Sequence, residues 1–325
     1  MPVPRTEFIW MNGEYVKWEN AKVHVLSHVL HYGSGWFEGI RCYDTKRGPA
    51  IFRLKEHIKR LENSVKIYHA ELPYSQKQIC DETVELVRKN KLASCYIRPL
   101  AYRGLGEMGV NPLGCPMELI IAAWEWGRYL GKEALEEGVD VCVSSWNHLT
   151  PNTMPSISKA SSNYMNSQLV RLEAVRHGYS EGISLDSYGN LSEGSGENVF
   201  LVADGTLITP PAGASLLPGI TRDTVIQLAH DLKIPVKEQT IPRAMLYVAD
   251  EVFMTGTAVE MTPVRSVDRL TVGSGKTGPI TTKLMKAFFS VIQDGKDPHG
   301  WLTFINSGKK TTSVSKSAKK KTGKK

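Results

Sequence analysis

The sequence predicts a mixed α/β (α+β) fold of two domains. At 325 residues, the chain is about twice as long as an average domain of roughly 150 residues, so each half can bury a core. Short apolar segments alternate with amphipathic helical segments along both halves. Hydrophobic residues make up 41% of the chain and charged residues 22%, which is typical of a globular protein. We therefore expect a smaller N-terminal α/β domain over residues 1–124, a connector over 125–137 and a larger mixed domain over 138–306.

The N-terminal half is expected to begin with a β-hairpin. Asn12-Gly13 separates the apolar segments 8–11 and 14–16, and this dipeptide favours a tight hairpin turn. A later helix places Leu54, Ile58, Leu61, Val65 and Tyr68 on one face. The other predicted elements, in chain order, are a strand that ends at Asp44, a loop over 46–49, a strand over 50–53, a helix over 75–90, and strands over 94–102 and 118–124.

The C-terminal half is expected to alternate strands with three helices. Asp204-Gly205 predicts a second hairpin turn, and Gly178 ends the first helix. The predicted strands are 139–145, 182–186, 198–202, 206–209 and 251–255, and the predicted helices are 164–177, 221–232 and 277–293. The helix over 221–232 carries four inward positions, Val225, Leu228, Ala229 and Leu232.

The net charge of +7 comes from the end of the chain. Residues 308–325 read GKKTTSVSKSAKKKTGKK, and without these eight lysines 32 basic residues face 33 acidic ones. The segment over 307–325 has no apolar periodicity, so we expect a disordered Lys-rich tail. Such a tail attracts phosphates, but nothing else in the chain is typical of a nucleic-acid-binding protein, and we expect no specific nucleic-acid partner.

The cysteine pattern and the hydropathy favour a cytoplasmic protein. The five cysteines have no metal-ligand spacing and are odd in number, so we expect reduced thiols and no metal. No segment approaches the roughly 20 apolar residues of a membrane span, and the N-terminus lacks the apolar core of a signal peptide.

Lys159 is the first candidate catalytic residue. Between Asp140 and Arg171 it is the only formally charged side chain. Burial in such a stretch lowers the pKa of an amine, and a neutral amine can attack a carbonyl group. This stretch alone favours the alternative of a lysine on an exposed loop.

Three glycine-containing stretches add candidate binding groups. Leu216–Thr221 leads into a helix with Thr221 as the expected N-cap, and a helix N-terminus suits a phosphate. Gly256–Ala258 follows a strand and could form a second group of backbone donors. Ser192–Asn198 contains two acids, either of which could pair with a pyridine nitrogen. In isolation, an ordinary capped helix is the better explanation of Leu216–Thr221, and the other two stretches are weak signals.

In this order, however, the stretches resemble the fold-type IV pyridoxal-phosphate aminotransferases. The resemblance extends from about Phe8 to Asn306, and within the fold it is nearest to the bacterial branched-chain amino acid aminotransferases. Two domains with pyridoxal 5′-phosphate at their interface are implied. The segments that carry the resemblance are HYGSGWFEGIRCY, FRLKEHIKRL, YIRPL, SKASSNY, EGISLDSYGNLSEGSGENVF, LPGITRD and DEVFMTGTAVEMTPVRSVD.

The resemblance implies a role for each cofactor residue. Lys159 matches the lysine that holds the cofactor covalently and moves the substrate proton. Glu193 matches the acid that faces the pyridine nitrogen, and Tyr164 the tyrosine near the phenolic oxygen. Arg60 matches the arginine that binds the cofactor phosphate, although the helical pattern by itself predicts a surface residue at this position. The other implied phosphate-side residues are Leu217, Ile220, Thr221 and Thr257.

The resemblance also implies a pocket with two kinds of wall. Arg98 matches the residue that binds the distal carboxylate of glutamate, and Tyr96 with Thr257 and Ala258 matches the α-carboxylate site. The implied apolar wall consists of Tyr32, Phe37, Met108, Val110, Trp126, Tyr129 and Tyr164, although core packing alone would explain most of these aromatic residues. In the family, Tyr32 and Val110 enter from the neighbouring subunit, which implies a homo-oligomer, at least a dimer and possibly a hexamer.

The implied activity is reversible transfer of the amino group of L-leucine, L-isoleucine or L-valine to 2-oxoglutarate. The products are a branched 2-oxo acid and L-glutamate, in a ping-pong cycle through pyridoxamine phosphate. A D-amino acid aminotransferase or an aminodeoxychorismate lyase shares the cofactor stretches and is the nearer alternative. A nucleic-acid-binding protein that uses its basic tail is the alternative from another class.

Overall fold

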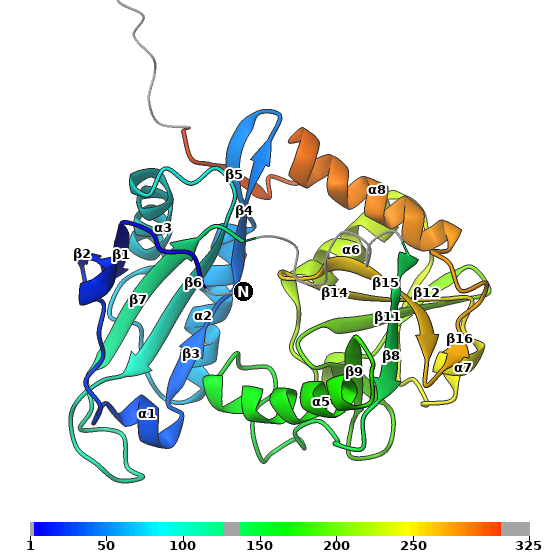
Figure 1. Ribbon diagram of the computed structural model, residues 1–325, viewed down its shortest axis with the longest axis horizontal. Helices are drawn as coiled ribbons and strands as arrows, with labels where there is room; N and C mark the ends of the chain where they lie inside the picture. The colour runs from blue at the N-terminus through cyan, green and yellow to red at the C-terminus, as the bar shows by residue number, and fades with distance from the viewer. Residues whose placement is uncertain (1–2, 127–136, 307–325) are drawn as a thin grey trace, which may run out of the picture.

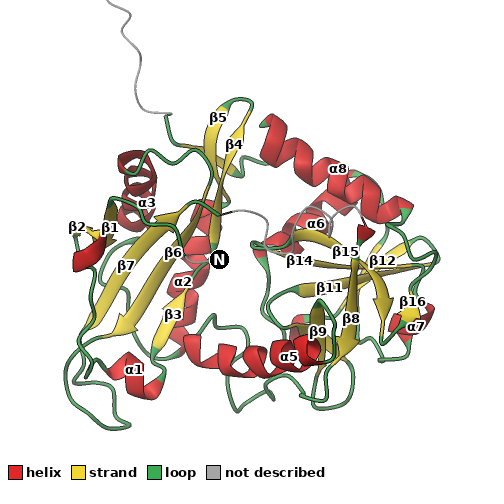
Figure 2. Cartoon of the chain, viewed as in Figure 1, coloured by secondary structure: helices red, strands yellow, loops and turns green. Residues whose placement is uncertain are grey.

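The protein consists of two β-sheets with helices packed around them (Figures 1 and 2). This computed structural model describes residues 3–126 and 137–306. Most of the expected connector and the Lys-rich tail lie outside these ranges. Among the described helices, none has both the length and the apolar character needed to cross a membrane. The mixed α/β prediction is confirmed, whereas the domain boundaries at 124, 137 and 306 stay predictions.

The first sheet has eight strands in the order β17-β5-β4-β6-β7-β1-β2, with β3 paired to β6. The predicted hairpin is confirmed, since Asn12 and Gly13 form its turn with φ values of 50° and 98°. The strands are β1 (Phe8–Met11), β2 (Glu14–Lys17), β3 (Gly35–Phe37), β4 (Ile40–Thr45), β5 (Gly48–Phe52), β6 (Cys95–Arg103), β7 (Met117–Trp124) and β17 (Leu302–Phe304).

Two helices, α2 (Leu54–Ile67) and α3 (Gln76–Lys89), cover one face of this sheet (Figure 2). Four of the five predicted apolar positions of α2 are buried there, and the fifth, Tyr68, is partly buried at the helix end. Ser75 caps α3 in a capping box with Gln78, which satisfies the free amides of the first turn. The opposite face of the sheet is therefore left to contact the second half of the chain.

The second sheet has nine strands in the order β10-β9-β8-β15-β14-β11-β12-β13, with β16 paired to β15. It is mixed, because β8 pairs in parallel with both β9 and β15. The strands are β8 (Val139–Val143), β9 (Glu181–Leu185), β10 (Leu191–Gly194), β11 (Asn198–Ala203), β12 (Thr206–Thr209), β13 (Val236–Glu238), β14 (Glu251–Gly256), β15 (Glu260–Val267) and β16 (Leu270–Thr271).

Helix α8 joins the two sheets. It packs with α6 over the second sheet and also contacts β4 of the first, and Figure 1 shows one of its ends beside the β4–β5 hairpin. The chain then returns to the first sheet as β17, which pairs with β5. The helices of the second half are α5 (Tyr164–Arg176), α6 (Ile220–Asp231), α7 (Met245–Val248) and α8 (Pro279–Asp294), with 3-10 turns at Ser161–Asn163 and Ala212–Ala214. The first half also contains the short helix α1 (His28–Tyr32) and a 3-10 turn at Trp18–Asn20.

Several details of the second half differ from the expectation. Leu232 is 42% exposed, so its prediction as an inward residue is wrong. The helix ends before it, Lys233 adopts a left-handed φ of 57°, and Ile234 enters the core instead. The strands β10, β13, β15, β16 and β17 and the helix α7 are not among the predicted elements. In β15, Pro263 interrupts the strand pattern, because proline cannot donate a hydrogen bond to a neighbouring strand.

Candidate active site

A cavity of about 600 Å³ lies between the two sheets and contains most of the predicted site residues. Its walls come from both halves of the chain, so neither half forms it alone. The predicted residues that line it are Phe37, Arg60, Tyr96, Arg98, Trp126, Lys159, Tyr164, Glu193, Leu217, Ile220, Thr221, Thr257 and Ala258.

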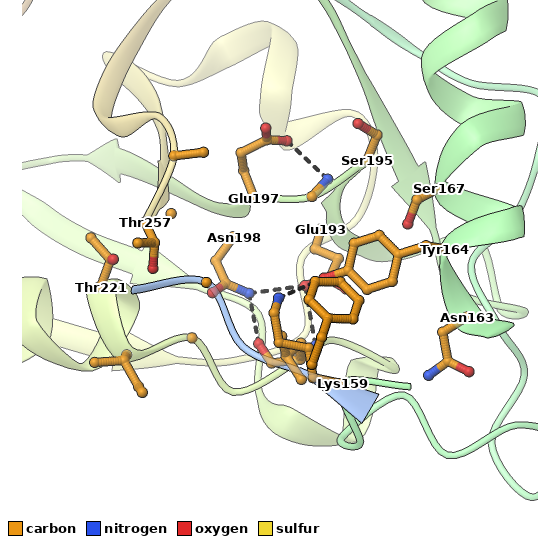
Figure 3. Close-up of a pocket in the computed structure, with 18 of the residues that line it drawn as sticks. Lys159, Asn163, Tyr164, Ser167, Glu193, Ser195, Glu197, Asn198, Thr221 and Thr257 are labelled. Carbon is orange, nitrogen blue, oxygen red and sulfur yellow. Dashed lines mark hydrogen bonds between the residues drawn. The ribbon is translucent and has the colours of Figure 1, made fainter. Parts of the chain in front are cut away.

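Lys159 lies in the loop between β8 and α5, with its amine inside the cavity (Figure 3). Its Nζ donates a hydrogen bond to Tyr164 Oη at 2.6 Å. Burial, together with the nearby Arg60 guanidinium, lowers the pKa of Lys159 from 10.5 to about 8. The expected loss of hydration is confirmed, and the alternative of a lysine on an exposed loop is wrong.

The backbone of Lys159 is held by residues of the N-terminal half. Ser64 Oγ, on α2, accepts a hydrogen bond from the Lys159 amide at 2.9 Å. The Ser64 carbonyl accepts one from Ser158 Oγ at 3.0 Å, and the amide of Phe37 donates to the Lys159 carbonyl at 3.1 Å. Ser64 is not among the predicted site residues, because a serine inside a helix gives no local signal of a distant partner.

Tyr164 is the first residue of α5 and faces Lys159 across the cavity. Burial and the carboxylate of Glu193 raise the pKa of the Tyr164 phenol well above its ordinary value. The phenol therefore stays protonated at neutral pH and can accept a hydrogen bond from the amine while donating one to a ligand.

Glu193, at the end of β10, is held by three donors. Its Oε2 accepts from Asn198 Nδ2 at 3.0 Å and from the Leu217 amide at 3.1 Å, and its Oε1 lies 3.1 Å from His148 Nε2. Figure 3 shows the Asn198 side chain directed toward this carboxylate. These contacts fix the orientation of the carboxylate. The sequence analysis missed His148, which carries no motif of its own.

The N-terminus of α6 forms another wall. The N-cap is Gly219, without a side-chain cap, so the prediction of Thr221 as N-cap is wrong and Thr221 is the second residue of the helix. A Cβ at Gly219 would lie 1.9 Å from Asn198 Oδ1, which explains why this turn needs glycine. The uncapped first-turn amides remain available to an anion.

Arg60 reaches this wall from α2. Its Nη1 donates to the Pro218 carbonyl at 2.9 Å, directly before the helix. The side chain is only 14% exposed, so the reading of Arg60 as a surface residue is wrong. Its Nε and Nη2 donate to Glu38, a fully buried carboxylate that the sequence analysis did not select.

The donors fit pyridoxal 5′-phosphate. The cavity offers an amine at Lys159, a carboxylate at Glu193 and a phenol at Tyr164, with helix amides and a guanidinium for a phosphate. Thr255 supports this fit, because its hydroxyl is buried on the cavity wall and has no hydrogen-bond partner among the described residues. A polar ligand would satisfy that hydroxyl.

Arg98 lies in an aromatic corner of the cavity. Its guanidinium carbon is 4.5 Å from the centre of the Phe37 ring and 5.4 Å from that of Tyr96. The Arg98 Nε is buried without a partner among the described residues, which is costly unless an anion binds there. Tyr96 and Arg98 both line the cavity, because alternate residues of β6 lie on the same face of the sheet.

Three predicted substrate residues do not line this cavity. Tyr32, Met108 and Val110 are 42%, 48% and 88% exposed and do not line it. Tyr129 lies outside the described residues. The role of Tyr32 and Val110 in a neighbouring subunit stays a prediction.

Comparisons with known proteins agree with this geometry. The family described as amino-transferase class IV matches residues 35–267. The branched-chain-amino-acid aminotransferase of Escherichia coli (strain K12) is 54% identical over 308 residues, which cover 94% of this chain and 100% of that protein. A crystal structure of the Escherichia coli branched-chain amino acid aminotransferase has a TM-score of 0.91 at 54% identity, covering 93% of this chain and 100% of that chain. The T.th. branched-chain amino acid aminotransferase, complexed with N-(5′-phosphopyridoxyl)-L-glutamate, has a TM-score of 0.88 at 47% identity, covering 93% of this chain and 99% of that chain.

Proposed function

The chain belongs to the class IV aminotransferase family, and from this premise we propose that it is a branched-chain amino acid aminotransferase. It transfers the amino group of L-leucine, L-isoleucine or L-valine to 2-oxoglutarate. The observation that carries this proposal is a single cavity in which the buried amine of Lys159 faces the fixed carboxylate of Glu193, with Arg98 set in an aromatic wall.

The cofactor is pyridoxal 5′-phosphate, which supplies an electron sink for the charge left when an amino acid loses its Cα proton. We assign its covalent attachment to Lys159. Arg60, Thr257 and the uncapped amides at Ile220 and Thr221 would hold its phosphate, with Leu217 beside them.

Lys159 is the base that moves the substrate proton. With a pKa of about 8, roughly a tenth of the amine is unprotonated at pH 7, far more than at its ordinary pKa, and this fraction can act as a general base. Its hydrogen bond to Tyr164 Oη directs the amine toward the centre of the cavity. The Ser64 hydroxyl holds the backbone of the lysine, so the amine returns to the same position in each cycle.

Glu193 provides the charge that keeps the cofactor's ring nitrogen protonated. Its donors from Asn198, Leu217 and His148 prevent the carboxylate from rotating away. A protonated ring nitrogen lowers the barrier to proton removal, so this carboxylate acts on the rate more than on binding.

The cavity has both apolar and cationic walls, which would let it accept a branched apolar side chain as well as a dicarboxylate. Phe37, Trp126 and Tyr164 offer an apolar surface to a branched side chain, and Arg98 offers a cation to the distal carboxylate of a dicarboxylate. Tyr96 and the turn at Thr257-Ala258 would take the α-carboxylate. The T.th. relative, solved with a phosphopyridoxyl-glutamate adduct, supports the dicarboxylate side of this assignment.

We also propose that the protein works as at least a homodimer. Tyr32 stacks on His28, whose Nε2 contacts the Gly109 carbonyl at 2.9 Å, so α1 and the loop that carries Met108 and Val110 form one surface. Several large apolar side chains are exposed on this surface, which favours a protein partner: Leu26, Leu30, Tyr32, Leu105, Met108, Val110 and Leu113. In a symmetric dimer formed through this surface, Tyr32 and Val110 of each chain would reach the cavity of the other.

The free state of all five cysteines supports a reducing compartment, and we propose the cytoplasm.

A panel of L- and D-amino acids with 2-oxoglutarate as acceptor tests the proposed activity. We expect L-leucine, L-isoleucine and L-valine to give glutamate, and their D-enantiomers to give none. Turnover of D-alanine would instead indicate a D-amino acid aminotransferase, and pyruvate release from aminodeoxychorismate would indicate a lyase. Activity that survives removal of residues 308–325 would separate the enzyme from any binding of nucleic acid by the tail.

A further inference from the structure

Glu38 is a buried carboxylate beside the cavity. It lies between β3 and β4 and is 0% exposed, while its neighbours Phe37 and Gly39 both line the cavity. Its backbone amide donates to the Pro99 carbonyl at 2.9 Å, which fixes the position of the residue. A carboxylate is rarely buried to this extent without specific partners.

The partners of Glu38 lie one helical turn apart on α2. Arg60 donates to both carboxylate oxygens, from Nε to Oε1 at 2.7 Å and from Nη2 to Oε2 at 2.9 Å. His57 Nδ1 lies 2.7 Å from Oε2 and is itself 1% exposed. This two-point pairing fixes the plane of the guanidinium as well as its distance.

The charge of each residue in this cluster is set by burial and by its partners. Burial alone would raise the pKa of Glu38, but Arg60 and His57 lower it below its ordinary value, so the carboxylate is ionised. Burial lowers the pKa of His57, which favours a neutral ring that donates its Nδ1 proton to Glu38. Glu38 and Arg60 therefore form a buried ion pair.

Arg60 keeps donors beyond those used in this pair. Glu38 accepts from Nε and Nη2, and the Pro218 carbonyl accepts from Nη1 at 2.9 Å. A guanidinium has more N–H donors than these three acceptors use, so donors remain on the side that lines the cavity. Because Pro218 directly precedes the α6 N-cap, these donors lie next to the uncapped helix amides.

We propose that Glu38, assisted by His57, is a positioning residue that holds Arg60 in the orientation needed to bind the cofactor phosphate. The inference rests on the proposed use of pyridoxal 5′-phosphate. Without Glu38, the guanidinium can rotate about its long side chain, and it must lose that freedom when the phosphate binds. Glu38 makes no contact with the cofactor itself and acts only through Arg60.

The test compares two ligands on the purified apoenzyme. Pyridoxal 5′-phosphate and pyridoxal share the aldehyde ring, but only the first carries the phosphate. In Glu38→Gln, the amide keeps the shape of the side chain and loses its charge. We expect the dissociation constant for pyridoxal 5′-phosphate to rise roughly tenfold to a hundredfold, and the constant for pyridoxal to change less than about twofold.

Glu62→Gln is the matched control. Glu62 is on the same helix and pairs with a cation, Lys59, at 2.7 Å, but that pair is exposed and away from the cavity. We expect it to bind both ligands as the wild type does. Unchanged binding of pyridoxal 5′-phosphate by Glu38→Gln overturns the proposal, and so does an equal loss for both ligands, which indicates a general structural role. Wild-type protein that binds neither ligand contradicts the proposed function instead.

A pair of His57 variants tests the same idea if Glu38→Gln does not fold. Asparagine places an amide donor close to the position of Nδ1, whereas leucine has none. His57→Leu is expected to weaken pyridoxal 5′-phosphate binding about fivefold and leave pyridoxal binding unchanged. His57→Asn is expected to restore most of the loss. Equal binding by both variants overturns the role of His57 and of the Glu38 cluster.

Discussion

The hydroxyl of Ser64 and the backbone amide of Lys159 form a 2.9 Å hydrogen bond that connects the two halves of the chain at the candidate catalytic lysine. Ser64 is one helical turn beyond Arg60 on α2. One face of this helix therefore carries both the guanidinium next to α6 and the anchor of the lysine, so a shift of α2 would displace both together.

Ser64→Ala is expected to lower kcat several-fold and leave the cofactor bound. The substitution removes one buried hydrogen bond, and a typical bond of this kind contributes about 1 kcal/mol. The loss allows the lysine loop more freedom, which should affect proton transfer more than the Michaelis constants. Stopped-flow measurement of the leucine half-reaction would check this. A normal rate together with reduced thermal stability would show that the bond supports only the fold.

Lys159→Ala is expected to abolish turnover and covalent attachment of the cofactor. Among the described residues, Lys159 is the only lysine that lines this cavity, so no other described amine is placed to replace it. Borohydride reduction of the wild type, followed by peptide mapping, should label Lys159. Label on any other lysine would contradict the assignment.

Glu193→Gln is expected to slow proton abstraction severely while the cofactor still binds. Glutamine keeps the size of the side chain but cannot supply the charge that keeps the ring nitrogen protonated. The rate of the first half-reaction with leucine is the appropriate measurement.

Glu197→Gln is the control for this variant. Burial, followed by the charge of Glu181, raises the pKa of Glu197 to about 8, so the acid is largely protonated at pH 7 and glutamine resembles its existing state. We therefore expect a small effect. If the half-reaction rate falls more in Glu197→Gln than in Glu193→Gln, Glu197 rather than Glu193 is the acid that faces the ring nitrogen.

Arg98→Leu is expected to damage the glutamate half-reaction far more than the leucine half-reaction. A charge-assisted contact is worth about 1.5–3 kcal/mol, so the loss for the dicarboxylate should be roughly tenfold to over a hundredfold. Leucine should bind as well as before or slightly better, since the buried, unpaired Nε of Arg98 is removed. Equal losses for both substrates would indicate that Arg98 holds the α-carboxylate or supports β6.

The stability of the apoenzyme is expected to depend on pH through Lys159. Its pKa falls from 10.5 to about 8 on folding, so between these values the unfolded chain binds more protons than the folded one. Stability should therefore rise with pH across this window. The uncharged variant Lys159→Met should remove that dependence and should be more stable than the wild type at pH 7, by about 2–3 kcal/mol. Denaturant titrations at pH 7 and pH 10 would test both points, and an identical pH dependence in the two proteins would contradict the burial of the amine.

The local sequence was enough to predict most of the longer helices and strands. The spacing of Leu54, Ile58, Leu61 and Val65 identifies the buried face of α2, because helical periodicity depends on residues within a few turns of each other. The absence of other charges around Lys159 singled this residue out, but the stretch alone favoured an exposed loop, and the packing of the two halves decides its burial. The resemblance then supplied residues, such as Glu193 and Arg98, that periodicity alone would leave as ordinary loop or strand residues.

Only the tertiary structure decided which distant groups meet. Glu38 and His57 pair around Arg60, Ser64 binds the Lys159 amide, and His148 contacts Glu193. Each contact joins residues far apart in the sequence and depends on how α2 and the two sheets pack. A local sequence pattern carries no information about such pairs. The strand β15 likewise depends on the fold. Pro263 weakens the strand preference of this segment, but pairing with β14 and β8 on either side outweighs that weakness.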